Sequence, residues 1–286
     1  MDDKPIKSTT SFLETLQNHK MTTKVIRRIP RSARQQAAIK YTSLVDLVVK
    51  QTSNPDAWEK LALFPFQAFK LPITTNSEKK SLTSIIKSNL QSADLPSIKV
   101  NPKWKEKSLK LIVEAKISEG DISGALRTLT SEDTLAPQDK TTLDILREKH
   151  PPPPSNFCFN VPSPSNISTF SPSPADIEKV IHSFPVGSAG GLDGLRPQHL
   201  KDMIGKCNGE VRVKLLDALV DLVSVLLSGN VPESVCPWLY GASLTALKKK
   251  DGGTRSIAVG NVLRRLPAKL ACQSVQNIAN QLFQPI

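Results

Sequence analysis

The chain has 286 residues, a formal net charge of +12 at pH 7 and a hydrophobic content of 39%. This length allows one or two domains, and the modest hydrophobic content with 22 prolines favours folded segments joined by extended stretches. No apolar run approaches the roughly 18 residues of a membrane span, and the polar residues 1–5 do not resemble a secretory leader. We therefore expect an intracellular protein, nuclear or cytoplasmic, without a membrane partner.

The positive charge favours an anionic partner, because cations that bind a nucleic-acid backbone release its condensed counterions. A basic surface without any ligand is the alternative. The cysteines form no CxxC pair and stand away from the histidines, which predicts free thiols and argues against a zinc site. These cysteines are Cys158, Cys207, Cys236 and Cys272.

Residues 1–30 are polar and lack sustained periodicity, which predicts a disordered tail. A basic cluster overlaps the end of this tail. It fits a nucleic-acid arm, a nuclear localisation signal or one solvated face of a helix. The members of this cluster are Lys24, Arg27, Arg28, Arg31, Arg34 and Lys40.

Residues 31–150 are predicted to form a helical region with an internal linker near residues 71–102, which are rich in Ser, Thr and Lys. Asn54 and Pro55 divide the first part into two helices, because proline is tolerated in the first turn of a helix but not in its interior. The part after the internal linker contains apolar stripes that predict three short helices.

Residues 151–173 begin with four prolines and continue rich in Ser and Pro, which predicts a semi-rigid linker. The remaining residues, 174–286, form the second predicted region. It opens with a helix that Ser173 caps, and it contains a long apolar helix from residue 210 to residue 227.

A glycine-rich loop occupies residues 187–195. It lacks the Gly-Lys-Ser/Thr sequence of a nucleotide-binding P-loop, and a helix rather than a strand precedes it, so neither common phosphate-binding loop fits. The glycines instead favour tight turns and close backbone packing. Asp193 is expected to cap the next helix, with Pro197 in its first turn, and His199 is expected to serve packing or hydrogen bonding.

A β-hairpin is predicted from a strand over residues 239–247, an Asp-Gly-Gly turn at residues 251–253 and a return strand over residues 254–259. Lysines supply point charges and arginine supplies a planar fork, so a cluster of both types suits a ligand with several phosphates. A solvated basic turn is the alternative. The cluster at the predicted tip contains Lys248, Lys249, Lys250 and Arg255.

These features follow one another in an order that resembles the fingers of reverse transcriptases from non-LTR retroelements. The loop at residues 187–195 is followed by a long helix, by Gly-Asn-Val-Pro at residues 229–232 and by Trp238. The basic hairpin then ends in Arg-Ser-Ile at residues 255–257. The resemblance covers approximately residues 174–286.

The resemblance implies that basic residues of the hairpin bind the triphosphate of an incoming nucleotide or the backbone of an RNA or DNA template. Lys250 and Arg255 are the best candidates, and Lys248 and Lys249 support them. The following helix of the family presents a basic face near the template. The residues that match this face are Arg264 and Arg265.

Two residues depart from the family pattern, since Ser256 stands where the family places proline and Pro267 falls inside the next predicted helix. The family's metal-binding aspartates belong to a later palm, and no Asp or Glu follows Thr254 here. Mg²⁺ is therefore expected only together with a palm, and we assign no catalytic or metal-binding residue. The resemblance predicts that this chain alone is inactive as a polymerase.

The sequence thus predicts a mainly α-helical chain with a small β-hairpin, in the α+β class. Its expected parts are a helical N-terminal region, a Pro-rich linker and truncated fingers without a palm. The expected function is contact with nucleic-acid or nucleotide phosphates. The alternative is a helical interaction module, or an inert relic, without any nucleic-acid role. The helix over residues 210–227 would lack the palm that normally covers it.

Overall fold

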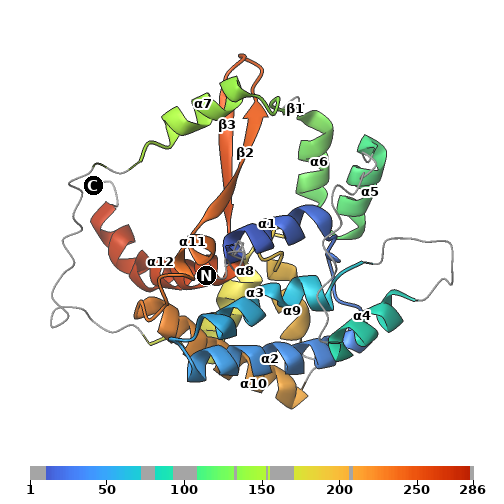
Figure 1. The fold of residues 1–286 in the computed structure, drawn as a ribbon, viewed down its shortest axis with the longest axis vertical. Coiled ribbons are helices and arrows are strands. Elements are labelled where there is room, and N and C mark those ends of the chain that lie inside the picture. Colours follow the sequence, from blue (N-terminus) through green and yellow to red (C-terminus); the bar gives the residue numbers. More distant parts are fainter. Residues whose placement is uncertain are drawn as a thin grey trace, which may run out of the picture. The chain divides into compact units, whose positions relative to one another are not determined.

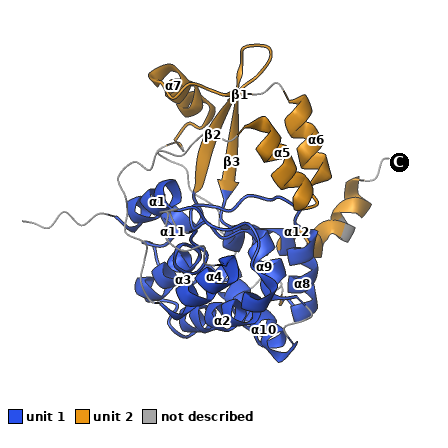
Figure 2. Cartoon of the chain, turned by 90° about the vertical axis from the view of Figure 1, so that its right-hand side faces the viewer, with its two compact units in different colours: residues 1–105, 172–241, 260–270 blue, residues 106–171, 242–259, 271–286 orange. Residues whose placement is uncertain are grey.

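The computed structural model describes residues 11–71, 81–92, 108–131, 134–152, 154, 171–205 and 209–283. The chain is mainly helical with one small antiparallel sheet of three strands, which confirms the expected α+β class (Figure 1). It divides into two compact units, and each unit is assembled from separated parts of the sequence (Figure 2). The first unit comprises residues 1–105, 172–241 and 260–270, and the second comprises residues 106–171, 242–259 and 271–286.

The first unit is helical. Its helices are α1 (Phe12–Thr22), α2 (Arg34–Lys50), α3 (Pro55–Ala68), α4 (Leu82–Gln91), α8 (Pro174–Ser183), α9 (Pro197–Met203), α10 (Gly209–Leu227) and α11 (Cys236–Leu239). A short 3-10 turn, η1 (Arg31–Ala33), precedes α2. Helix α12 (Val262–Phe283) begins in this unit and ends in the second.

The second unit combines three helices with the sheet. Its elements are α5 (Leu109–Ser118), α6 (Ile122–Thr130), α7 (Lys140–Lys149), β1 (Thr134–Leu135), β2 (Ala242–Lys248) and β3 (Thr254–Gly260). The strand order is β1-β2-β3, and β1 pairs with β2 in the register Thr134 to Lys248. No residue of β2 or β3 is fully buried, so the sheet contributes little core of its own.

Several predicted helix boundaries follow from local capping chemistry. The Asn54 side chain accepts a hydrogen bond from the Asp56 amide at 3.1 Å, and Pro55 occupies the first turn of α3, as the sequence indicates. Ser173 caps α8 in the same way by accepting from the Asp176 amide at 3.2 Å. Helix α12 continues through Pro267, although this residue cannot donate the usual backbone hydrogen bond.

Helix α10 is covered by the N-terminal part of the chain. It packs along α2 and also contacts α8, and it buries Leu215, Leu219 and Leu222 completely. The facing core contains Tyr41 and Val45 of α2, which are also fully buried. The expectation that this apolar helix lacks its partner is therefore wrong, because α2 supplies the apolar face that it needs. Among the helices described by the structure, none combines the length and apolar character of a membrane span.

Two helices form where the sequence predicts irregular structure. Helix α1 lies within residues 1–30, where a disordered tail is expected, and Ser11 and Glu14 form a reciprocal capping box at its start. Its Leu16 is fully buried in the core of the first unit. Helix α4 lies within the linker predicted near residues 71–102, where Ile86 reaches the same core.

The unit boundaries also differ from the predicted division at residues 151–173. The N-terminal helices α2 and α3 share one core with α8, α9 and α10, whereas α5, α6 and α7 belong with the hairpin. The cause is the broad apolar face of α10, which pairs with a helix from the other side of the predicted linker. Residues 153 and 155–170 of that linker lie outside the described residues.

The glycine-rich loop is tied to the start of α12 through Asn261. The Oδ1 atom of this fully buried side chain accepts a hydrogen bond from the Leu192 amide at 2.8 Å. Its Nδ2 atom donates to the carbonyl of Trp238 at 2.6 Å. The loop approaches closely at Gly191, where an added Cβ would lie 2.5 Å from the Cα of Asn261. This position therefore has no room for a side chain.

Replacing Gly191 by alanine is expected to destabilise the first unit by about 1–3 kcal/mol, because the new methyl group overpacks the loop against backbone atoms of Asn261. Urea unfolding followed by circular dichroism measures this loss. Gly253→Ala is the matched control, since its Cβ would meet only the side chains of Asp251 and Lys249 and no backbone atom. Equal losses in both variants would contradict the close approach at Gly191.

Candidate nucleic-acid interface

The β2–β3 hairpin ends in a tight turn that the sequence predicts correctly. The Lys249 amide donates to the Gly253 carbonyl at 2.8 Å, and Gly252 has a φ of 82°, which favours glycine. The carboxylate of Asp251 accepts from the Gly253 amide at 2.9 Å. The only carboxylate in the segment from Lys248 to Arg255 is thus engaged in holding the turn.

The four predicted cations of the hairpin lie together on this turn and its flanking strand ends. Lys248, Lys250 and Arg255 are exposed, and Lys249 is half-buried. With one carboxylate among four cations, the segment carries a net charge of +3. An exposed ribbon with this charge can approach a polyanion without burying its own side chains.

Helix α7 adds a fifth cation that sequence reasoning missed. The ammonium group of Lys149 donates a hydrogen bond to the carbonyl of Thr254, next to Arg255. These two residues are 105 positions apart in the chain. No local periodicity links a helix with a strand over that distance, so only the tertiary structure places Lys149 beside the hairpin.

The other two predicted cations lie in the first unit and bind main-chain oxygens. Arg264 donates from Nη1 to the Tyr240 carbonyl at 2.6 Å, and Arg265 donates from Nη2 to the Ala189 carbonyl at 2.6 Å. The six predicted phosphate-binding residues therefore divide between the two units. The guanidinium groups of Arg264 and Arg265 each also hold a main-chain carbonyl group of the first unit.

A second ionic group involves Asp193 of the glycine-rich loop and Lys20 of α1. Asp193 is 2% exposed and accepts from the Leu195 amide at 3.2 Å. Lys20 of α1 donates to the Gly191 carbonyl at 2.6 Å. Burial raises the pKa of Asp193 to about 7, while the Leu195 amide and the charges of Lys20 and Arg265 oppose this rise.

Asp193 does not cap α9, contrary to the expectation from the sequence. Arg196 occupies the position before this helix, and Asp193 closes the preceding turn through the Leu195 amide. Tyr41 is buried nearby, and burial together with the charge of Asp193 raises the pKa of its phenol. Among the described residues, its hydroxyl group has no hydrogen-bond partner.

His199 serves packing and hydrogen bonding, as predicted. Its Nδ1 atom accepts from the Arg196 amide at 3.2 Å, so Nε2 carries the proton and donates to the Ile26 carbonyl at 2.8 Å. Burial lowers the pKa of His199 to about 4, which keeps the ring neutral. Its ring also packs against Phe69 at a centroid distance of 4.8 Å.

The N-terminal basic cluster contains at least one structural member. Arg34 forms an ion pair with Asp202 at 2.8 Å, and the other oxygen of that carboxylate accepts from the Ile29 amide at 2.8 Å. Both charged side chains are largely buried. Arg34 therefore fixes the segment before α2 against α9 rather than facing solvent.

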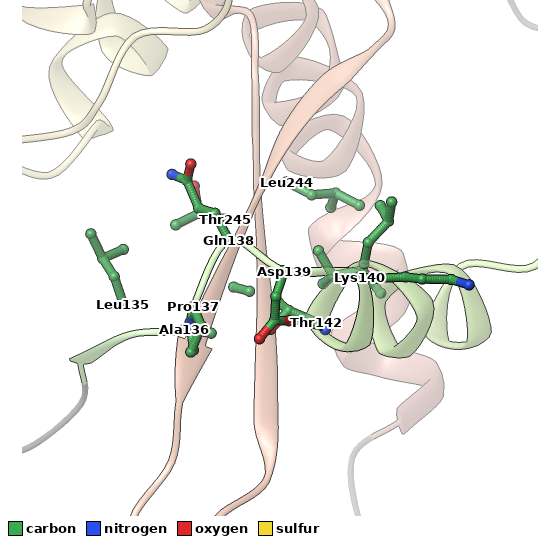
Figure 3. A pocket seen from close by; sticks show the side chains of 12 residues that line it. Leu135, Ala136, Pro137, Gln138, Asp139, Lys140, Thr142, Leu244 and Thr245 are labelled. Carbon is green, nitrogen blue, oxygen red and sulfur yellow. Dashed lines mark hydrogen bonds between the residues drawn. The ribbon is translucent and has the colours of Figure 1, made fainter.

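The second unit also contains a cavity of about 600 Å³ (Figure 3). Leu143 and Leu146 of α7 and Leu244 of β2 form part of its apolar lining. Asp139, at the start of α7, accepts from the Thr142 amide at 2.8 Å and so acts as a helix cap. One lysine, Lys140, lines the cavity, so it offers no cluster of cations for a phosphate.

The described part of the chain brings together no three His, Cys, Asp or Glu side chains that are able to hold a metal ion. Cys236 and Cys272, the cysteines among the described residues, are both free thiols. The predicted basic residues of the hairpin therefore remain the best-defined candidate interface.

Replacing Asp193 by asparagine is expected to change how stability depends on pH. Because its folded pKa lies above the unfolded value of about 3.9, Asp193 contributes stability at low pH that is lost as pH rises from about 4 to about 7. Asparagine still accepts from the Leu195 amide but does not titrate. We take the free energy of unfolding of the wild type minus that of the Asp193→Asn variant. This difference should decrease by at most about 4 kcal/mol as pH rises across this range.

Urea unfolding at pH values from 4.5 to 7.5 measures this difference. The depressed pKa of His199 has the opposite effect, since its contribution to stability is lost as pH falls from about 6.5 to about 4. Both proteins contain His199, so its effect cancels in the difference. A difference that stays constant with pH would show that Asp193 is ionised throughout.

Comparisons with known proteins leave the chain without a match. No protein-family model, curated protein or solved structure matches it. The similarity to reverse transcriptase fingers therefore remains a hypothesis that rests on the order of the sequence motifs.

Proposed function

We propose that this chain corresponds to the fingers of a non-LTR retroelement reverse transcriptase, together with a helical N-terminal region. Its β2–β3 hairpin contacts the phosphate backbone of RNA or DNA, and the triphosphate of a nucleotide is a second candidate ligand. The observation that carries this proposal is the convergence of Lys248, Lys249, Lys250 and Arg255 on one solvent-facing turn.

The geometry of the turn supports phosphate contact in two ways. The segment holds four cations and one carboxylate, and this carboxylate of Asp251 accepts from the Gly253 amide within the turn. The lysines and the arginine extend from a ribbon whose strands bury none of their residues, so a strand of nucleic acid can reach them. Lys149 extends the same basic surface through its bond to Thr254.

A helical interaction module without a nucleic-acid role is the second candidate function. The observation that favours it is an apolar stripe on α6, where Ile122, Leu126 and Leu129 are each more than half exposed. Their spacing places them on one face of the helix. Such a stripe fits a protein partner rather than a polyanion.

Changing Lys248, Lys249, Lys250 and Arg255 together to alanine is expected to weaken binding of a 20-nucleotide single-stranded RNA whatever its sequence. Each lost phosphate contact flattens the plot of log affinity against log salt by about 0.7, so the four changes should flatten it by about 2.8. Fluorescence anisotropy of the full chain between 50 and 300 mM NaCl measures this slope.

The matched control replaces four exposed lysines elsewhere, and so removes the same charge: Lys50, Lys60, Lys110 and Lys179. Thermal unfolding checks that both variants keep their fold, since exposed turn charges contribute less than about 0.5 kcal/mol. Equal slopes for the two variants would assign binding to net charge alone. RNA affinity that does not respond to salt in the wild type would reject the nucleic-acid role and favour the interaction module.

A further inference from the structure

The ladder between β1 and β2 stops partway along β2. The amide of Ala136, which directly follows β1, donates to the Ala246 carbonyl at 3.0 Å. Among the described residues, this is the last hydrogen bond that joins the two segments. The chain then leaves the sheet and begins α7 at Lys140 (Figure 3). Residues 242–245 of β2 therefore extend past the end of β1.

This stretch of β2 presents an unpaired edge. The main-chain groups of Leu244 and Ala242 point to the same side as those of Ala246, because the hydrogen-bonding direction of a strand alternates from residue to residue. In the described parts of the chain, no residue continues the ladder of β1 to Leu244 or Ala242. Each of these two residues thus offers one amide donor and one carbonyl acceptor to a further strand.

The cavity of the second unit adjoins this edge. Leu244 and Ala246 of β2 line it together with Leu143 and Leu146 of α7. Its volume of about 600 Å³ lies within the range of roughly 300–1,000 Å³ that is usual for ligand pockets. The side chains of Leu143 and Leu244 are 45% and 41% exposed, so much of this apolar lining remains accessible.

An extended polypeptide matches the edge and the cavity together. A peptide backbone presents donors and acceptors at the spacing of a strand edge, whereas a phosphate backbone presents acceptors only. Successive side chains of an added strand point to opposite faces of the sheet. An apolar side chain can therefore enter the cavity while its neighbours in the peptide stay outside.

The charge around the edge favours an acidic peptide. Residues 140–150 contain three cations and two carboxylates, and the segment from Lys248 to Arg255 carries a net charge of +3. Asp139, the carboxylate that lines the cavity, already accepts from the Thr142 amide at 2.8 Å. Complementary charge would therefore attract a peptide with Asp or Glu beside its apolar residues.

We propose that residues 242–245 of β2 and the adjoining cavity bind an extended peptide segment of a partner protein. The segment adds a strand to the edge that β1 leaves unpaired, and it inserts an apolar side chain between β2 and α7. The site differs from the proposed nucleic-acid interface in its residues and in its ligand class, since it uses main-chain groups and leucines instead of cations.

The test begins with a phage library of random ten-residue peptides that is panned against the full chain. We expect enriched peptides to carry apolar residues at every second position with Asp or Glu beside them. These peptides are synthesised with a fluorescent label, and anisotropy measures their affinity. A variant that combines Leu143→Gln and Leu146→Gln should bind them about tenfold more weakly than the wild type, because a polar lining no longer accepts the apolar side chain.

The matched control combines Leu126→Gln and Leu129→Gln on α6, which are also accessible leucines and also leave the net charge unchanged. The control should bind the peptides as the wild type does. Peptides that lose affinity only in the control would place the protein partner on α6 and overturn the proposal. The absence of enriched peptides, or equal affinity for the cavity variant and the wild type, would overturn it too.

Methylation of the peptide amides tests strand addition without any change to the protein. Because alternate amides of a strand face opposite edges, methylating one alternate set blocks pairing with β2, and methylating the other set leaves it intact. We expect the first set to abolish binding and the second to preserve it. Equal effects of the two sets would reject strand addition, and this result decides the proposal even if the cavity variant fails to fold.

RNA binding separates this proposal from the proposed function. The cavity variant removes no cation, so its plot of RNA affinity against salt should keep the wild-type slope. The four-alanine hairpin variant should change that slope whether or not the peptide site exists. Loss of peptide binding and loss of RNA binding are therefore read from different variants, and either proposal can fail alone.

Discussion

The side-chain amide of Asn261 joins three segments of the first unit that lie far apart in the sequence. Its oxygen accepts from the Leu192 amide in the glycine-rich loop, and its nitrogen donates to the Trp238 carbonyl. Asn261 itself directly precedes α12. Because both of its polar groups are buried, each unmet hydrogen bond would cost about 1–3 kcal/mol. Gly191 is required at this point, since any side chain there would meet the backbone of Asn261. This contact holds Trp238 and Asn261, which flank the hairpin in the sequence, together within the first unit.

Charge in this protein serves two physically different purposes. Lys20, Arg34 and Arg265 bind carbonyl groups or carboxylates inside the first unit and so act as structural ties. Lys248 and Lys250 extend into solvent from a ribbon without a core. A net charge of +12 alone does not distinguish these groups, since both contribute equally to it. The ties give up part of their hydration on folding, and the carbonyl and carboxylate groups that they contact compensate for that loss.

The two units differ in how they bury apolar surface. The first unit gathers helices from both ends of the chain around α10 and places large side chains such as Trp58 and Trp238 in one core. Among its described residues, the second unit buries few apolar side chains, such as Val113 and Ala125, and leaves β2 and β3 largely accessible. A ribbon of this kind suits contact with an extended ligand, because such a ligand can bind along an exposed strand without a pocket.

The sequence by itself determined the local elements. Caps at Asn54 and Ser173 and the Asp-Gly-Gly turn act over a few residues, so helices α3 and α8 and the hairpin could be predicted. The capping box of α1 was also readable, although the polar composition around it predicted disorder. Tertiary structure alone decided that α2 covers α10, that Arg265 holds the glycine-rich loop and that Lys149 joins the hairpin. The residues joined by Arg265 and by Lys149 stand 76 and 105 positions apart, and α2 and α10 stand farther apart still. A periodic sequence pattern carries no information about which residue is contacted at such a separation.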